Sequence, residues 1–353
     1  MSNSKNARIS LVLWTLLCTI CMAGMLWFTA TKQIVIADVG GSEREKVNVD
    51  SSRDENMEPL YFAQDITDSN RLDIPLEAGT KADKVMVDNR YMDKELWIYI
   101  KDASEDFYQK SLIGGSTAAI LNGYYEQQGE YTILKIQLTD VFEYRSILEE
   151  GHLYVEFYAP WELYDQIVVI DPAFGGKQSG VTEGGYAEKD LNLEITMRVR
   201  NALEQYDIKA YYTRLEDKEV SLMDRASIAN EVNADMFISI GGAGVNVDQE
   251  MYGTTCFYNS HYYIPDFGSV DLADILEYHV VSAASGRALG LVEAEDDSIL
   301  SLLKVPAAQL SVGYLTNTQE RTLLKDPAYL DKIAEGIVSA VLEAFAQIAD
   351  TEQ

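Results

Sequence analysis

Two short apolar runs beyond residue 166 are each followed by a pair of glycines. Residues 167–170 are followed by Gly175-Gly176, and residues 236–240 run directly into Gly241-Gly242. Glycine tolerates backbone angles that other residues avoid, so these pairs indicate tight turns where two strands end. Strand and helix patterns alternate from Gln166 onward. The sequence therefore predicts an α/β domain over residues 166–350, a three-layer sheet with helices on both faces.

Local signals place the elements of this domain. Asp190 is expected to cap one helix, and Ser221, with Asp224 three residues on, is expected to open a second in a near capping box. Further helices are predicted over 272–284 and 326–349. The predicted strands cover residues 167–171, 208–213, 236–240, 253–258 and 307–315.

Residues 59–160 are rich in β-forming side chains. Turn residues separate short runs over 84–87, 96–100, 131–138 and 153–157. This spacing predicts a small all-β sandwich. Residues 32–58 are charged and polar and include Gly40-Gly41, so they are expected to form a flexible linker.

The N-terminal residues predict a membrane anchor. No charge occurs between Arg8 and Lys32, and the apolar stretch would span about 33 Å as a helix. Lys5 and Arg8 precede it, so residues 1–8 are expected in the cytoplasm, 9–31 as a single-pass signal anchor, and the rest outside the cell membrane. Removal as a long signal peptide is the alternative.

The charge of the chain is strongly negative. It has 28 Lys and Arg against 57 Asp and Glu, a net charge of −29. Such a surface repels phosphate polymers, which argues against a nucleic-acid partner. Cys256 is the one cysteine outside the apolar stretch, so no disulfide can form within the outer part.

Several separated motifs resemble one known family. The C-terminal domain is similar to the zinc-dependent N-acetylmuramoyl-L-alanine amidases, which are bacterial cell-wall hydrolases. The resemblance rests on motifs at three positions and on the stretches between and after them. The three motifs are Asp171-Pro172-Ala173-Phe174-Gly175-Gly176, Glu188-Lys189-Asp190 and Ser239-Ile240-Gly241-Gly242. The other matching stretches are Thr213-Arg214, Arg225, Val305-Pro306-Ala307 and Val312-Gly313-Tyr314-Leu315-Thr316-Asn317.

The resemblance implies a dismantled metal centre. The family's zinc ligands fall at Phe174, Glu188 and Gly241, and its catalytic glutamate at Ser311, so only Glu188 keeps a ligand-type side chain. At roughly 3–4 kcal/mol for each ligand, two losses weaken zinc binding by more than about 10⁴-fold. We expect no cofactor and no catalytic residue. Phe174, Glu188, Gly241 and Ser311 then mark a groove in which Phe174 fills the metal position. Glu188 is more simply explained by its place at a helix N-terminus, where the helix dipole stabilises a carboxylate.

Other residues offer weak substitutes for this centre. The histidines are His152, His261 and His279, each more simply explained as a surface or core-edge residue. A nucleophilic arrangement of Ser311 with His261 or His279 lacks the sequence signal of a nucleophile elbow.

The sequence supports three functional hypotheses. The first is a membrane-anchored extracellular amidase homologue, catalytically inactive, that binds peptidoglycan or a cell-wall protein. The second is an active amidase with a non-standard centre around Glu188. The third is a platform that regulates true amidases. The sandwich resembles in its position the wall-localisation modules of some cell-wall amidases, and a spacer without a ligand is the alternative.

Overall fold

The computed structural model describes residues 57–63, 70–104, 106–241, 250–260, 264 and 266–351, with the backbone of the short strand β1 (Gln33–Ile34). The chain divides into two compact units between Tyr158 and Ala159. Among these residues no helix has both the length and the apolar character to cross a bilayer. The predicted anchor, residues 9–31, lies outside the described part of the chain.

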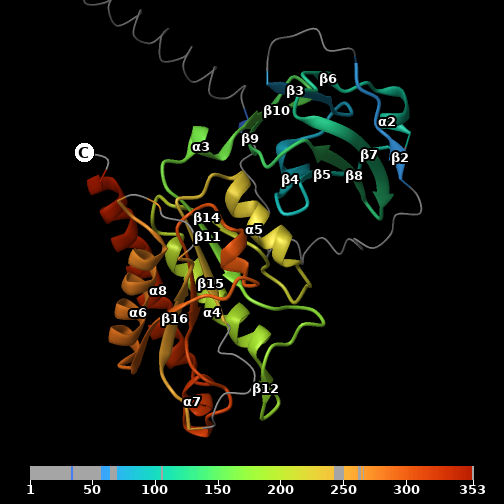
Figure 1. Cartoon of the computed structure of the whole chain (residues 1–353). Helices are drawn as coiled ribbons and strands as arrows, with labels where there is room; N and C mark the ends of the chain where they lie inside the picture. The colour runs from blue at the N-terminus through green and yellow to red at the C-terminus, as the bar shows by residue number, and fades with distance from the viewer. Residues whose placement is uncertain are drawn as a thin grey trace, which may run out of the picture. The chain divides into compact units, whose positions relative to one another are not determined.

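The first unit contains two five-stranded antiparallel sheets (Figure 1). One has the order β1, β9 (Glu143–Glu149), β10 (His152–Tyr158), β3 (Arg71–Pro75) and β6 (Gly114–Gly115). The other has the order β2 (Glu58–Pro59), β7 (Ile120–Gln128), β8 (Tyr131–Leu138), β5 (Glu95–Lys101) and β4 (Val85–Arg90). Helix α2 (Phe107–Lys110) and the short turn η2 (Ala82–Lys84) connect strands.

One apolar core joins the two sheets of this unit. Alternate residues of β5 (Leu96, Ile98 and Ile100) enter it together with Leu153 and Val155 of β10. A period of two is what a strand with one buried face requires. Each of the four sequence runs from which strands were predicted in this segment overlaps one observed strand: β4, β5, β8 and β10 in turn.

The second unit is built on one six-stranded mixed sheet. Its order is β14 (Lys209–Tyr212), β11 (Ile167–Pro172), β15 (Met236–Ile240), β18 (Ala307–Ser311), β16 (Thr254–Tyr258) and β17 (Ala288–Glu293). The first four strands are parallel, β16 is antiparallel to β18, and β17 is parallel to β16. The predicted α/β class is confirmed, although β17 was not predicted.

Helices cover both faces of this sheet (Figure 1). Val168 and Ile170 of β11 share a core with α4 (Glu188–Leu203), α6 (Ser269–Ala284) and α8 (Pro327–Thr351). Asp171, which points to the opposite face, contacts Arg225 of α5 (Leu222–Glu231). Shorter elements complete the unit: α3 (Pro160–Leu163), the hairpin β12 (Thr182–Glu183) and β13 (Tyr186–Ala187), η3 (Ile299–Leu302) and α7 (Thr318–Leu323).

Two predicted boundaries are wrong. Helix α4 begins at Glu188 with Ala187 as its N-cap residue, so Asp190 lies in the first turn and does not cap the helix. Strand β18 ends at Ser311 instead of residue 315, because the chain turns away through Gly313 at φ +155°. The Ser221 cap is confirmed, since its hydroxyl oxygen accepts a hydrogen bond from the Asp224 amide at 3.1 Å.

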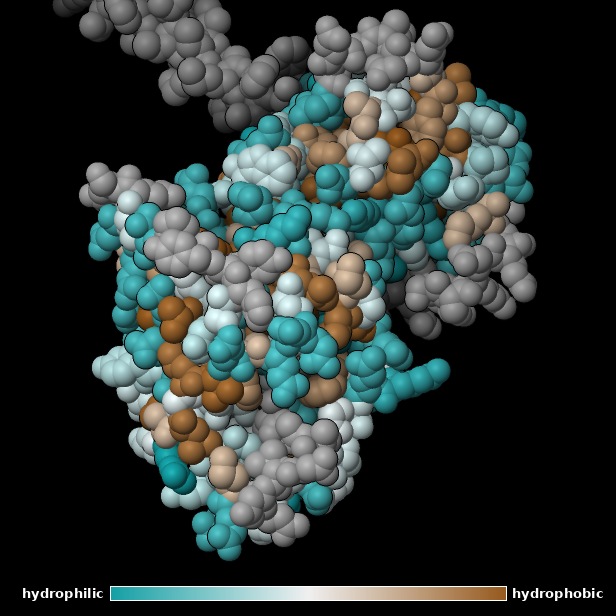
Figure 2. Space-filling model, viewed as in Figure 1, coloured by the Kyte–Doolittle hydropathy of each residue, from teal (hydrophilic) through white to brown (hydrophobic). Residues whose placement is uncertain are grey.

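The surface seen in Figure 2 is mixed, with hydrophilic side chains over much of it and apolar side chains between them. Leu222 and Met223, in the first turn of α5, are 49% and 66% exposed. Single exposed apolar side chains are ordinary on a soluble surface.

The close crossing of α6 and α8 gives a test of the packing. A Cβ added at Gly336 of α8 would lie 2.7 Å from the Cα of Val280 in α6. Gly336→Ala should therefore lower the free energy of unfolding, although alanine normally stabilises a helix interior by about 1 kcal/mol relative to glycine. Ser339→Ala, an exposed change on the same helix, is the control in urea denaturation. An increase in stability for Gly336→Ala would contradict this packing.

Candidate functional site

Two buried arginines hold the chain where β11 ends. Arg225 forms an ion pair with Asp171 at 2.5 Å and also donates to the carbonyl oxygens of Pro172 and Phe174. Arg214 donates to the carbonyl of Pro172 at 2.9 Å. Burial, with the nearby charge of Arg225, lowers the pKa of Arg214 to about 10, so it stays cationic at neutral pH. The position of Phe174 is therefore fixed by backbone contacts that need no metal.

The glycine turn after Phe174 is required by close packing. Gly175 has φ +134°, and a Cβ there would lie 2.2 Å from the carbonyl oxygen of Lys218. The amide of Gly176 donates to Asp217, which also pairs with Lys189 at 2.6 Å. The tight turn predicted at this glycine pair is confirmed.

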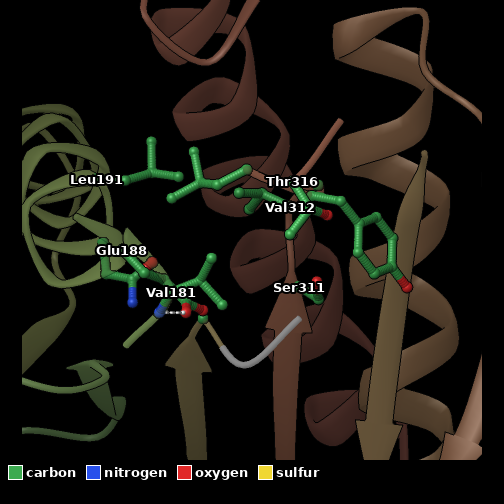
Figure 3. A pocket seen from close by; sticks show the side chains of 11 residues that line it. Val181, Glu188, Leu191, Ser311, Val312 and Thr316 are labelled. Carbon is green, nitrogen blue, oxygen red and sulfur yellow. Dashed lines mark hydrogen bonds between the residues drawn. The ribbon is translucent and has the colours of Figure 1, made fainter. Parts of the chain in front are cut away.

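A small pocket lies between the start of α4 and the turn after β18 (Figure 3). Its cavity of about 10 Å³ has room for one water molecule. It opens at the carboxyl ends of β15 and β18, where open α/β sheets bind ligands. Its lining residues are Val181, Glu188, Leu191, Asn192, Gly241, Ser311, Val312, Gly313, Tyr314, Leu315 and Thr316.

Three of the four positions named from the sequence meet at this pocket. Glu188, Gly241 and Ser311 line it, although they are far apart in the chain. Phe174 does not line it, and the expectation that its ring fills the metal position stays a prediction. The Phe174 ring instead lies against Gly180, where an added Cβ would come within 2.8 Å of two ring carbons, and the Phe174 backbone has φ +64°.

Glu188 has a structural role at the start of α4. Its side chain is 4% exposed, and one carboxylate oxygen accepts a hydrogen bond from the amide of Val181 at 3.0 Å (Figure 3). The amide of Glu188 in turn donates to the carbonyl of Val181 at 2.8 Å. A carboxylate in the first turn is also stabilised by the helix dipole. These contacts give Glu188 a structural role at the start of α4 that does not depend on a bound metal.

The space beside Gly241 is filled by Asn192. Gly241 has φ +124°, and an added Cβ would lie 2.2 Å from the amide nitrogen of Asn192. That nitrogen donates to the carbonyl of Ala173 at 3.2 Å. A side chain at position 241 therefore requires Asn192 to move and the backbone to change its conformation.

Ser311 is the last residue of β18 and is 1% exposed. Its hydroxyl has no hydrogen-bond partner among the described residues. Of the histidines, His152 pairs with Asp73 at 2.6 Å in the first unit, and His279 pairs with Glu343 at 2.6 Å between α6 and α8. Neither lines the pocket, and His261 lies outside the described residues.

The donor atoms at this pocket do not fit zinc. A zinc site takes at least three protein ligands from imidazole, thiolate or carboxylate groups. The lining residues supply one carboxylate, that of Glu188, and no imidazole or thiolate. Nowhere in the described part of the chain do three His, Cys, Asp or Glu side chains gather in a way that could hold a metal ion.

Glu320 of α7 is a buried carboxylate that sequence reasoning missed. It accepts hydrogen bonds from the amides of Tyr314 at 2.7 Å and Gly253 at 2.9 Å, and so holds the turn that lines the pocket. Burial raises the pKa of the Glu320 carboxyl above its ordinary value. The available signal was the spacing of Asn317 and Glu320, which resembles a capping box.

Comparisons with known proteins agree on one family. A model described as N-acetylmuramoyl-L-alanine amidase matches residues 168–343. The germination-specific N-acetylmuramoyl-L-alanine amidase of Bacillus subtilis (strain 168) is 27% identical over 209 residues, which are 54% of this chain and 85% of that protein. The N-acetylmuramoyl-L-alanine amidase CwlM of Mycobacterium tuberculosis is 31% identical over 180 residues, but the match spans only 44% of its length.

A solved structure is also similar to this chain. The N-acetylmuramoyl-L-alanine amidase from Clostridium difficile 630 is 33% identical, and the match covers 51% of this chain and 97% of that one, with a TM-score of 0.48. The chain belongs to the N-acetylmuramoyl-L-alanine amidase family. The matched residues fall in the second unit. The assignment of Phe174, Glu188 and Gly241 to ligand positions stays a prediction.

Removal of the buried negative charge should destabilise the second unit. Asp171→Asn leaves the Arg225 guanidinium buried without its counter-ion, which costs about 3–5 kcal/mol. Asp331→Ala breaks an exposed pair with Arg198 and should cost at most about 1 kcal/mol. Urea denaturation of both variants measures the difference. Equal losses would show that the buried pair is not a major support.

Glu320 should make stability depend on pH. Because its pKa is raised in the folded protein, its favourable contribution is complete below its ordinary pKa of 4.5 and is lost as the pH rises through the higher folded value. Glu320→Gln removes this dependence. The stability of the variant relative to the wild type should therefore increase between about pH 4 and about pH 7. Denaturation at several pH values, with exposed Glu335→Gln as control, tests this, and a constant difference would contradict it.

Proposed function

We propose that this chain is a non-hydrolytic member of its family, a cell-wall protein that binds peptidoglycan. The observation that carries the proposal is the composition of the pocket. One carboxylate, already hydrogen-bonded to the Val181 amide, stands beside a glycine whose side-chain space is occupied by Asn192. Ser311 offers a hydroxyl, which is a poor general base near neutral pH.

The reaction of the family explains why this composition matters. When bound, zinc would lower the pKa of a water ligand to about 7, far below that of bulk water, and a nearby carboxylate would serve as general base. Within the pocket, Glu188 orients the Val181 loop and Ser311 presents a neutral hydroxyl. These residues supply neither the ligand set for the metal nor a second carboxylate, so amide hydrolysis by the family route has no support here.

The ligand class follows from the family, since its named relatives are amidases of the N-acetylmuramoyl-L-alanine bond. The net charge of −29 disfavours attraction to anionic polymers, so we infer recognition by hydrogen bonds and shape rather than by charge. Residues 9–31 are proposed to anchor the protein in the cell membrane with both units outside. A cell-wall protein as partner is the alternative to peptidoglycan.

Hydrolysis and binding can be measured separately with the full chain in detergent. Incubation with muropeptides and added zinc should release no stem peptide above a protein-free blank, while a zinc-dependent family amidase serves as positive control. Cosedimentation with purified sacculi should retain the chain. Glu188→Ala is the matched variant, because Glu188 is the one lining carboxylate.

Two outcomes decide between the hypotheses. Peptide release that requires zinc and disappears in Glu188→Ala would establish an active amidase with a non-standard centre. Absence of both hydrolysis and sacculus binding, with capture of a cell-wall amidase, would favour the regulatory platform.

A further inference from the structure

Three buried polar atoms gather at the pocket without a protein partner. They are Asn192 Oδ1, Ser311 Oγ and Thr316 Oγ1, and none has a hydrogen-bond partner among the described residues. Asn192 and Ser311 are each 1% exposed. Native proteins satisfy more than about 90% of their buried polar groups, so three unsatisfied atoms at one cavity point to a shared ligand.

The orientation of Asn192 is fixed by its other atom. Its amide nitrogen donates to the carbonyl of Ala173 at 3.2 Å, and this leaves Oδ1 as the acceptor at the pocket. The hydroxyls of Ser311 and Thr316 can donate or accept. Figure 3 shows these two residues on the strand and turn that face the α4 side of the pocket, which carries Glu188 and Leu191.

The size and lining of the cavity limit its occupant. Its volume of about 10 Å³ holds one water molecule, and Val181, Leu191, Val312 and Leu315 contribute apolar side chains to its lining. A water molecule has two donors and two acceptors, and buried waters typically make about three hydrogen bonds. One molecule can therefore donate to Asn192 and bond to both hydroxyls.

We propose that one ordered water molecule, bound by Asn192, Ser311 and Thr316, bridges α4 to the turn after β18. It links α4 to the end of β18 and the turn that follows through these three side chains. The bridge provides each of the three atoms with a partner. It requires no charge and supplies no catalytic group.

The sign of one stability change tests this proposal. Thr316→Val keeps the shape of the side chain and removes the hydroxyl. If that hydroxyl binds the water, the variant loses a hydrogen bond and the thermal midpoint of the full chain falls. If the hydroxyl is buried without a partner, its removal relieves a desolvation penalty and the midpoint rises. Thr322→Val, whose hydroxyl bonds within exposed α7, is the control.

Crystals of the full chain provide the second measurement. We expect a density peak within about 2.7–3.2 Å of all three atoms, and its loss in Thr316→Val/Ser311→Ala. A raised midpoint in Thr316→Val, or the absence of the peak where other buried waters are seen, overturns the proposal. A peak with six or more oxygen ligands at about 2.3–2.6 Å also overturns it, because that geometry belongs to a calcium ion.

Discussion

The ion pair between Asp171 and Arg225 is the contact on which the rest of the site depends. It joins the end of β11 to α5 on the face of the sheet opposite α4, α6 and α8, and both side chains are nearly fully buried. A buried pair is stable only when its remaining hydrogen-bonding capacity is met. Here Thr213 and Ser239 donate to Asp171, while Arg225 donates to carbonyls of the following loop. The scaffold of the site therefore persists without a bound cation.

The walls of the pocket are joined by contacts between protein groups. In a zinc site of the family, side chains at positions 174, 188 and 241 would hold the metal between the loop after β11, the start of α4 and the end of β15. In this chain, small residues and one amide occupy the same junction: Gly241 leaves room, Asn192 enters it, and the Glu188 carboxylate is hydrogen-bonded to Val181.

Much of the fold could be predicted because strands buried on both faces have a strong signal. Residues 236–240 coincide with β15, and the predicted helix 272–284 lies within α6. Strand β17 was missed because it lies at the sheet edge, contains Gly290 and is largely exposed. Strand β7 was missed because Gly123 and a register shift interrupt its pattern, although Gly123 is needed where Leu60 and Phe62 pack against it.

The site was predictable only where motifs mark it. Glu188, Gly241 and Ser311 were found through their motifs and do meet, whereas Phe174 lies beside the pocket because the arginine contacts fix its loop. Asn192 carries no such signal, Thr316 lies in a motif without one that marks its role, and Glu320 has only its capping-box-like spacing from Asn317. Their roles arise from what faces them across the fold, and a single sequence does not contain that information directly.

Anomalous diffraction at the zinc edge tests the central claim most directly. Crystals of the full chain soaked in zinc should show no anomalous peak within bonding distance of Glu188, since the pocket offers one carboxylate and no imidazole. A fully occupied zinc ion bonded to Glu188 and to two other protein donors would contradict the account.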